Sequence, residues 1–147
     1  MKLGHVHLKV KELTRAEKFY TTALNATVSE RLEDHYSFLT VGEAHHDIAL
    51  QALGSSAAPP PLNAVGLYHS AFEVKETAEL KEVIRRLDSM NIHYQMVDHG
   101  ISWALYTEDP DGNGVEFYLD RRRAAKGRTI WNGYSTRLTL DNLIETS

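Results

Sequence analysis

The order of predicted secondary structure repeats once along this chain, and the repeat restricts the possible folds more than any other feature. Alternating apolar and polar residues predict a strand over 2–10, and helical spacing of apolar residues predicts a helix over 13–24. Three strand-like runs follow, at 26–31, 36–41 and 46–52. The second half has the same order, with a strand over 66–74, a helix over 76–90, and strands over 93–97, 101–106 and 115–119.

The two halves can be aligned residue by residue at their first strands. His5-Val-His-Leu-Lys-Val10 matches His69-Ser-Ala-Phe-Glu-Val74 at an offset of 69 − 5 = 64. A unit of this kind cannot bury its faces alone, and a duplicated pair of units buries them against each other. The sequence therefore predicts an α+β fold of two tandem βαβββ modules that form a curved mixed sheet lining a cleft.

One stretch rich in Pro, Ser and Ala, residues 54–61, separates the two halves. A chain of 147 residues has the size of one domain. We therefore predict a single domain, 1–147. It would contain module one (1–53), a linker (54–65), module two (66–120) and a C-terminal tail (121–147) that ends in a short docking helix near 138–144.

Composition narrows the class of protein. A net charge of −4 argues against a nucleic-acid binder, which usually carries a basic face. The chain has no cysteine, which excludes disulfides, Cys-bound zinc and thiol catalysis, and fits a reducing compartment. The first five residues lack the apolar core of a signal peptide, and no apolar run reaches membrane-spanning length. We expect a soluble cytoplasmic protein with no nucleic-acid or membrane partner.

The segment around Asp109-Pro-Asp-Gly112 is typical of a hairpin. Proline presets φ, aspartate caps its own backbone and glycine accepts a positive φ. Glu116 lies in the strand after this turn, between Val115 and Phe117. Glutamate is rarely buried without a partner, so Glu116 either points to solvent or faces inward because a cation needs it.

His5 and His69 occupy equivalent positions in the two halves, and the counterpart of Glu116 in the first half is Ala49. Two imidazoles and one carboxylate are the ligand set of many non-haem Fe(II) sites. The same set could hold Mn, Ni or Zn with water completing the shell. Taken alone, His5 could be a strand histidine of no special role, but the repeat-related positions favour a metal site.

Five motifs together resemble a known family: Gly4-His-Val-His-Leu-Lys-Val10, His45-His-Asp-Ile-Ala-Leu50, Gly66-Leu-Tyr-His-Ser-Ala-Phe72, Asp98-His-Gly-Ile-Ser-Trp-Ala-Leu-Tyr106 and Asp109-Pro-Asp-Gly-Asn-Gly-Val-Glu-Phe-Tyr118. Over about residues 3–122 the chain resembles the vicinal oxygen chelate (glyoxalase, bleomycin resistance and dioxygenase) superfamily. Within it, the chain is most similar to type I extradiol catechol 2,3-dioxygenases. Many of those enzymes carry four modules, whereas this chain has two.

The resemblance implies roles for six residues. The metal ligands of the family fall on His5, His69 and Glu116. The acid/base histidine of the family falls on His46, while a further pocket histidine and a tyrosine that touches the substrate oxygen fall on His99 and Tyr106. Three of these have simpler readings from the sequence alone: His46 as an exposed loop residue, His99 as a turn residue, and Tyr106 as an aromatic that packs the sheet.

The activity implied by the resemblance is extradiol ring cleavage of a small aromatic diol by O₂, with Fe(II) as the cofactor and a homodimer as the assembly. Two alternatives stay open. One is another metal-dependent enzyme of the superfamily, either a glyoxalase-like isomerase or an antibiotic-modifying thiol transferase. The other is a metal-free protein that binds a flat drug-like molecule. Ala49 stands near where a glyoxalase I would carry a fourth ligand, which counts against that activity.

Overall fold

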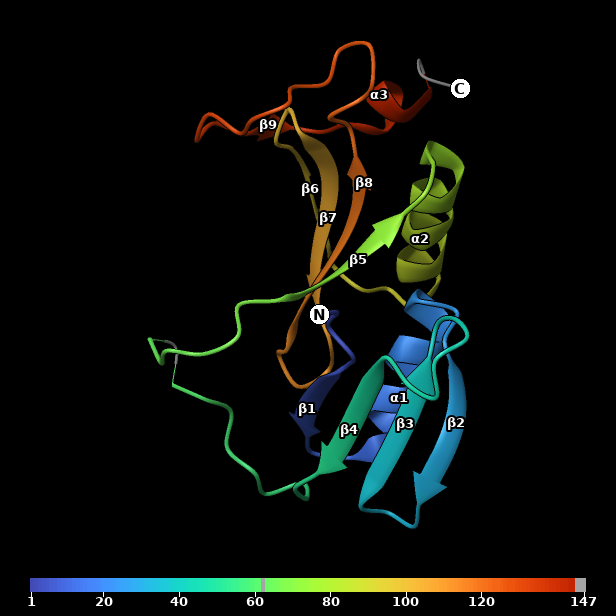
Figure 1. Cartoon of the computed structure of the whole chain (residues 1–147). Coiled ribbons are helices and arrows are strands. Elements are labelled where there is room, and N and C mark those ends of the chain that lie inside the picture. The colour runs from blue at the N-terminus through green and yellow to red at the C-terminus, as the bar shows by residue number, and fades with distance from the viewer. Residues whose placement is uncertain (62, 145–147) are drawn as a thin grey trace. The chain divides into compact units, whose positions relative to one another are not determined.

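The computed structural model describes residues 1–61 and 63–144, and the chain divides into two compact units (Figure 1). The first unit is Met1–Tyr68 together with Glu108–Asn113, and the second is His69–Thr107 together with Gly114–Ser147. Each unit is built on one βαβββ module. The α+β class and the two tandem modules predicted from the repeat are therefore confirmed.

The first unit has a sheet in the order β1-β4-β3-β2. Its elements are β1 (Val6–Val10), α1 (Leu13–Ala23), β2 (Thr27–Leu32), β3 (Tyr36–Thr40) and β4 (Ile48–Ala52). Strands β1 and β4 are parallel, and the other pairs are antiparallel. Helix α1 packs against β3 and β4 because its apolar residues recur at helical spacing and are buried there: Leu13, Ala16, Phe19, Tyr20 and Ala23.

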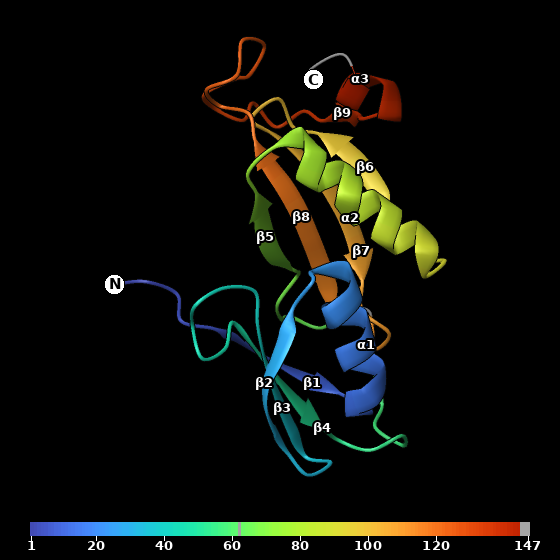
Figure 2. The same cartoon turned by 90° about the vertical axis from the view of Figure 1, so that its right-hand side faces the viewer.

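The second unit has a sheet in the order β5-β8-β7-β6-β9. Its elements are β5 (Ser70–Val74), α2 (Thr77–Ser89), β6 (Gln95–Asp98), β7 (Ser102–Glu108), β8 (Gly114–Asp120), β9 (Thr136–Arg137) and α3 (Leu140–Ile144). Helix α2 lies across one face of this sheet (Figure 2) and buries the stripe predicted from its periodicity: Leu80, Val83, Ile84 and Leu87. No helix in the described parts of the chain combines the length and the apolar character needed to cross a membrane.

The two helices end in the same way. Each C-cap residue, Leu24 or Met90, is followed by an asparagine in the left-handed region, Asn25 with φ 55° and Asn91 with φ 54°. Asparagine tolerates this conformation better than other residues with a Cβ, and it commonly stops a helix there. The repeat thus extends to how each helix turns back towards its next strand.

The registers of the two parallel strand pairs are also equivalent. In the first unit His7 pairs with Ala49, and in the second unit Ala71 pairs with Glu116. Ala71 is the residue that the offset of 64 aligns with His7. Ala49 is therefore the structural counterpart of Glu116, as the sequence alignment of the two halves indicated.

Both first strands begin later than their alternation predicts. Pairing starts only at Val6, opposite Ile48, and at Ser70, opposite Val115. Strand structure exists only where a partner strand supplies backbone hydrogen bonds, and alternation alone does not mark that limit. As a result, His5 and Tyr68-His69 lie just before the strands rather than inside them.

Candidate functional site

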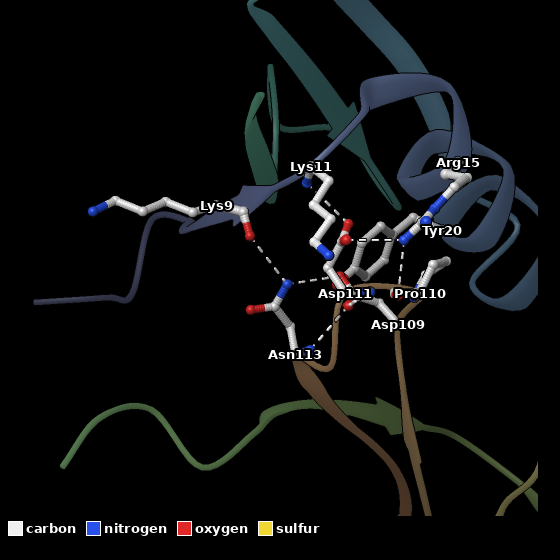
Figure 3. Close-up of polar contacts among 8 residues, drawn as sticks. All are labelled: Lys9, Lys11, Arg15, Tyr20, Asp109, Pro110, Asp111 and Asn113. Carbon is white, nitrogen blue, oxygen red and sulfur yellow. Dashed lines mark hydrogen bonds and ion pairs between the residues drawn. The ribbon is translucent and has the colours of Figure 1, made fainter. Parts of the chain in front are cut away.

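The tip of the β7–β8 hairpin belongs to the first unit, where Asp109 is its central polar residue (Figure 3). Residue Asp109 is only 4% exposed. Its side chain accepts hydrogen bonds from the Tyr20 hydroxyl (3.0 Å) and from the backbone N–H of Asp111 and of Asn113 (2.9 Å each). The Asn113 amide also donates to it, at 2.9 Å. Gly112, with φ 83°, completes the predicted turn.

Further contacts connect the same tip to β1 and α1. Asp111 accepts hydrogen bonds from Arg15 Nη2 at 2.9 Å and from the backbone N–H of Lys11 at 3.1 Å. Arg15 also donates to the Pro110 carbonyl at 2.8 Å, and Asn113 Nδ2 donates to the Lys9 carbonyl at 3.3 Å (Figure 3). The hairpin tip is thereby attached to the first unit one residue before β8, the strand that carries Glu116, begins.

The Tyr20–Asp109 contact leads to a prediction about alkaline pH. Burial, followed by the charge of Asp109, raises the pKa of Tyr20 above its ordinary value of 10.0. The unfolded chain then loses the proton above pH 10 while the folded chain keeps it, so the stability that this group contributes is complete below pH 10 and declines as pH rises.

We expect Tyr20→Phe to lower the free energy of unfolding by about 1–2 kcal/mol at neutral pH, through loss of one hydrogen bond to a carboxylate. Above pH 10 the wild type should lose about 1.4 kcal/mol per pH unit from this ionisation, and the variant should not. Urea unfolding of both proteins between neutral pH and about pH 11 measures the difference. A difference that stays constant over this range would contradict the assignment.

In the first unit, His5 and His46 lie side by side. Their ring centroids are 4.4 Å apart, and the His46 ring packs against Phe38 at 5.0 Å. The Nδ1 atoms of His46 and His45 are 2.9 Å apart, which requires that one donates and the other accepts. Partial desolvation lowers the pKa of His46, and the neighbouring His5 and His45 lower it further, so its neutral form is favoured.

In the second unit, the other four predicted residues form one hydrogen-bonded chain. His69 Nε2 lies 2.9 Å from Glu116 Oε2, and the Tyr106 hydroxyl donates to Glu116 Oε1 at 2.9 Å. His99 Nε2 lies 2.8 Å from the Tyr106 hydroxyl. His69 precedes β5, Tyr106 is on β7 and Glu116 is on β8, so the parallel pairing of β5 with β8 and the hairpin bring them together.

Glu116 faces inward, with only 9% of the residue exposed. Of the two orientations that the sequence allowed, the structure has the inward one, in which the carboxylate contacts His69 and Tyr106. His99 does lie in a turn, where its N–H donates to the Ser102 carbonyl at 2.9 Å, but its ring also joins the chain that leads to Glu116. Tyr106 likewise uses its hydroxyl rather than only packing the sheet.

Two residues of the site were missed by sequence reasoning, and both lie in the tail. Ser135 Oγ is 2.6 Å from His99 Nδ1, and the Trp131 ring stands edge-on to the His99 ring with centroids 6.2 Å apart. The tail reaches His99 because β9 pairs with β6, opposite Val97 and Asp98. A strand of two residues has no periodicity, so no local signal predicts it.

The donor atoms of the second unit fit a bound cation. Two ligand atoms bonded to one cation at right angles, with bonds of about 2.1 Å, lie about 3 Å apart. His69 Nε2 and Glu116 Oε2 are separated by 2.9 Å. His5 belongs to the first unit, and within residues 1–61 and 63–144 no three His, Cys, Asp or Glu side chains are grouped as a ready metal site. Convergence of all three ligands therefore stays a prediction.

Comparison with known proteins connects the sequence and the fold of this chain to one family. Curated relatives include Catechol-2,3-dioxygenase of Bacillus subtilis (strain 168), which is 31% identical over 146 residues, covering 97% of this chain and 51% of the relative. Biphenyl-2,3-diol 1,2-dioxygenase 2 of Rhodococcus globerulus is 35% identical over 123 residues, covering 81% of this chain and 63% of the relative. The chain thus spans between half and two thirds of the length of these relatives.

A solved structure confirms the fold. The glyoxylase/bleomycin resistance protein/dioxygenase domain from Frankia sp. EAN1pec superposes with a TM-score of 0.70 at 20% identity, covering 86% of this chain and 96% of that one. Residues 2–117 match the family model described as the Glyoxalase/Bleomycin resistance protein/Dioxygenase superfamily. This match extends over both modules, so the chain belongs to the Glyoxalase/Bleomycin resistance protein/Dioxygenase superfamily.

Proposed function

We propose that this protein is a metal-dependent extradiol ring-cleaving dioxygenase that acts on a catechol-type diol with O₂. The observation that carries the proposal is the His69–Glu116 pair, connected through Tyr106 to His99 by hydrogen bonds of 2.8–2.9 Å. The two curated relatives described above are named as diol dioxygenases, which supports this reaction class.

His5, His69 and Glu116 would hold the metal. A set of two histidines and one carboxylate favours Fe(II), although Mn, Ni or Zn could occupy the same donors. When bound, Fe(II) would supply coordination positions for the diol oxygens and for O₂, and its charge would favour the ionised diol. The absence of cysteine and the need to keep iron reduced together support a cytoplasmic location.

The other residues of the site would bind and orient the diol and move protons. Tyr106 presents a hydroxyl beside Glu116, and His99 presents a ring nitrogen beside Tyr106. Both would hydrogen-bond a diol oxygen and hold the ring in register. His46, next to His5, would accept and return a proton. Histidine suits this task because its ordinary pKa lies near neutrality.

Two alternatives are weaker for structural reasons. Ala49 stands at the register position equivalent to Glu116, so β4 supplies no further ligand there, as a glyoxalase-like isomerase would require. A metal-free drug-binding protein would have no need of a buried carboxylate paired with His69. We propose a homodimer as the assembly, as the resemblance to the extradiol dioxygenases implies.

The test uses protein purified without oxygen and loaded with Fe(II). We expect it to consume O₂ and to give yellow ring-opened products from members of a catechol panel. His46→Ala should keep its metal and lose turnover by about 10²–10⁴-fold, the usual contribution of a general acid–base group. His35→Ala, at an exposed turn of the same unit, is the matched control and should keep wild-type turnover.

Oxygen uptake, product absorbance and metal analysis are measured on all three proteins. Failure of the iron-loaded wild type to react with any diol would contradict the dioxygenase proposal. Wild-type turnover by His46→Ala would contradict only the role of His46.

A further inference from the structure

We propose that Ser135 is a positioning residue that holds His99 in the Nε2–H tautomer, with that N–H directed at Tyr106. Ser135 lies in the tail, outside residues 2–117 that match the family model. Its hydroxyl oxygen is 2.6 Å from His99 Nδ1. The effect of Ser135 on turnover rests on the proposed function, whereas the tautomer of His99 can be measured independently of it.

The direction of each hydrogen bond follows from counting the protons available along the hydrogen-bonded row of side chains from Glu116 to Ser135. A carboxylate only accepts, so the single hydroxyl proton of Tyr106 is donated to Glu116 Oε1. The Tyr106 oxygen is then available as an acceptor for His99 Nε2, 2.8 Å away, and Nε2 must carry a proton. In a neutral imidazole the other nitrogen is an acceptor, so the Ser135 hydroxyl donates to Nδ1.

Ser135 contacts His99 from the C-terminal tail, outside the βαβββ module. Without the Ser135 hydroxyl, the ring can take the other tautomer, in which Nδ1 carries the proton and donates a hydrogen bond to water. His99 Nε2 would then accept a hydrogen bond from the Tyr106 hydroxyl, and Glu116 would lose the hydrogen bond that this hydroxyl donates to it. A hydroxyl that donates to Nδ1 therefore favours the arrangement in which Tyr106 stays directed at the carboxylate.

Contacts between the tail and the end of β6 anchor the backbone around Ser135. Asp98 and Thr136 are partners in the β6–β9 pairing, and they directly adjoin His99 and Ser135 in the chain. The Arg128 N–H donates to the Gly100 carbonyl at 2.8 Å. A Cβ on Gly100, which has φ 76°, would come within 2.9 Å of the Arg128 side chain, so glycine permits this close approach. The serine thus reaches His99 from an anchored segment.

Nitrogen NMR of histidine side chains in the metal-free protein tests the proposal directly. In mildly alkaline buffer the wild type should show His99 as the Nε2–H tautomer. Ser135→Ala should move the Nδ1 and Nε2 shifts of His99 towards each other, as expected for a mixture of tautomers. Ser135→Thr, which keeps the hydroxyl, should restore the wild-type pattern. Ser89→Ala, an exposed serine that donates to the Arg86 carbonyl on α2, is the control.

Turnover gives a second readout in the iron-loaded protein. We expect Ser135→Ala to lower kcat about ten-fold with little change in KM, which is the lower end of the effect of outer-shell partners. His99 shifts in Ser135→Ala identical to those of the wild type would overturn the proposal, as would an Nδ1–H tautomer in the wild type. If the wild type cleaves no diol, the NMR result still decides the role of Ser135.

Discussion

Glu116→Ala is expected to lower the affinity of the protein for Fe(II) by on the order of 100-fold or more and to abolish ring cleavage. Glu116 is the only carboxylate in the proposed ligand set, and it also accepts the hydrogen bonds of His69 and Tyr106. Its removal deletes a negatively charged ligand and leaves the other two side chains without their acceptor. A neutral pair of imidazoles binds Fe(II) far more weakly than a charged set of three ligands.

Equilibrium dialysis against Fe(II) under nitrogen, followed by metal analysis, measures the affinity. Glu73→Gln is the matched control, since Glu73 is an exposed carboxylate of β5 in the same unit that accepts a hydrogen bond from the Tyr118 hydroxyl. Circular dichroism of the metal-free proteins verifies that both variants are folded. Wild-type Fe(II) affinity in Glu116→Ala would contradict the metal site, even if ring cleavage were lost.

Asp109→Ala is expected to produce the largest loss of stability, about 4 kcal/mol in the free energy of unfolding. Four donors lose their acceptor at once: the Tyr20 hydroxyl, two backbone N–H groups and the Asn113 amide. Asp109 is almost completely buried, so water cannot replace the carboxylate without opening the hairpin tip. Each unsatisfied buried donor costs about 1–3 kcal/mol, and partial relaxation keeps the total below their sum.

Urea unfolding followed by circular dichroism measures this effect. Asp34→Ala is the control, because the Asp34 side chain is 96% exposed and makes one ion pair with Arg31. A surface pair of this kind contributes at most about 1 kcal/mol. Asp109→Asn, which keeps an acceptor oxygen, should lie between the two. Equal unfolding midpoints for Asp109→Ala and Asp34→Ala would show that the buried bonds at the hairpin tip do not stabilise the protein.

The repeat in the sequence was sufficient to predict the two modules, since apolar periodicity reports which face of each element is buried. The same reasoning identified Ala49 as the counterpart of Glu116 in the first half, and the strand pairings His7–Ala49 and Ala71–Glu116 have the equivalent register. Of the four side chains that meet in the second unit, His69 and Glu116 followed from the repeat and from residue type, whereas His99 and Tyr106 were identified only through the resemblance to the family. Convergence of His5 with His69 and Glu116 stays a prediction that metal binding will test.

Only the tertiary structure determined the contacts between residues that lie far apart in the sequence. Asp109 reads in sequence as a turn residue, but it also accepts the hydroxyl of Tyr20, 89 positions away. Ser135 reads as one of several polar tail residues, and only the pairing of β9 with β6 brings it to His99. Local sequence encodes periodicity, caps and turns, because these depend on neighbouring residues. Hydrogen bonds between side chains that are distant in sequence depend on which strands pair, and local sequence patterns do not predict strand pairing.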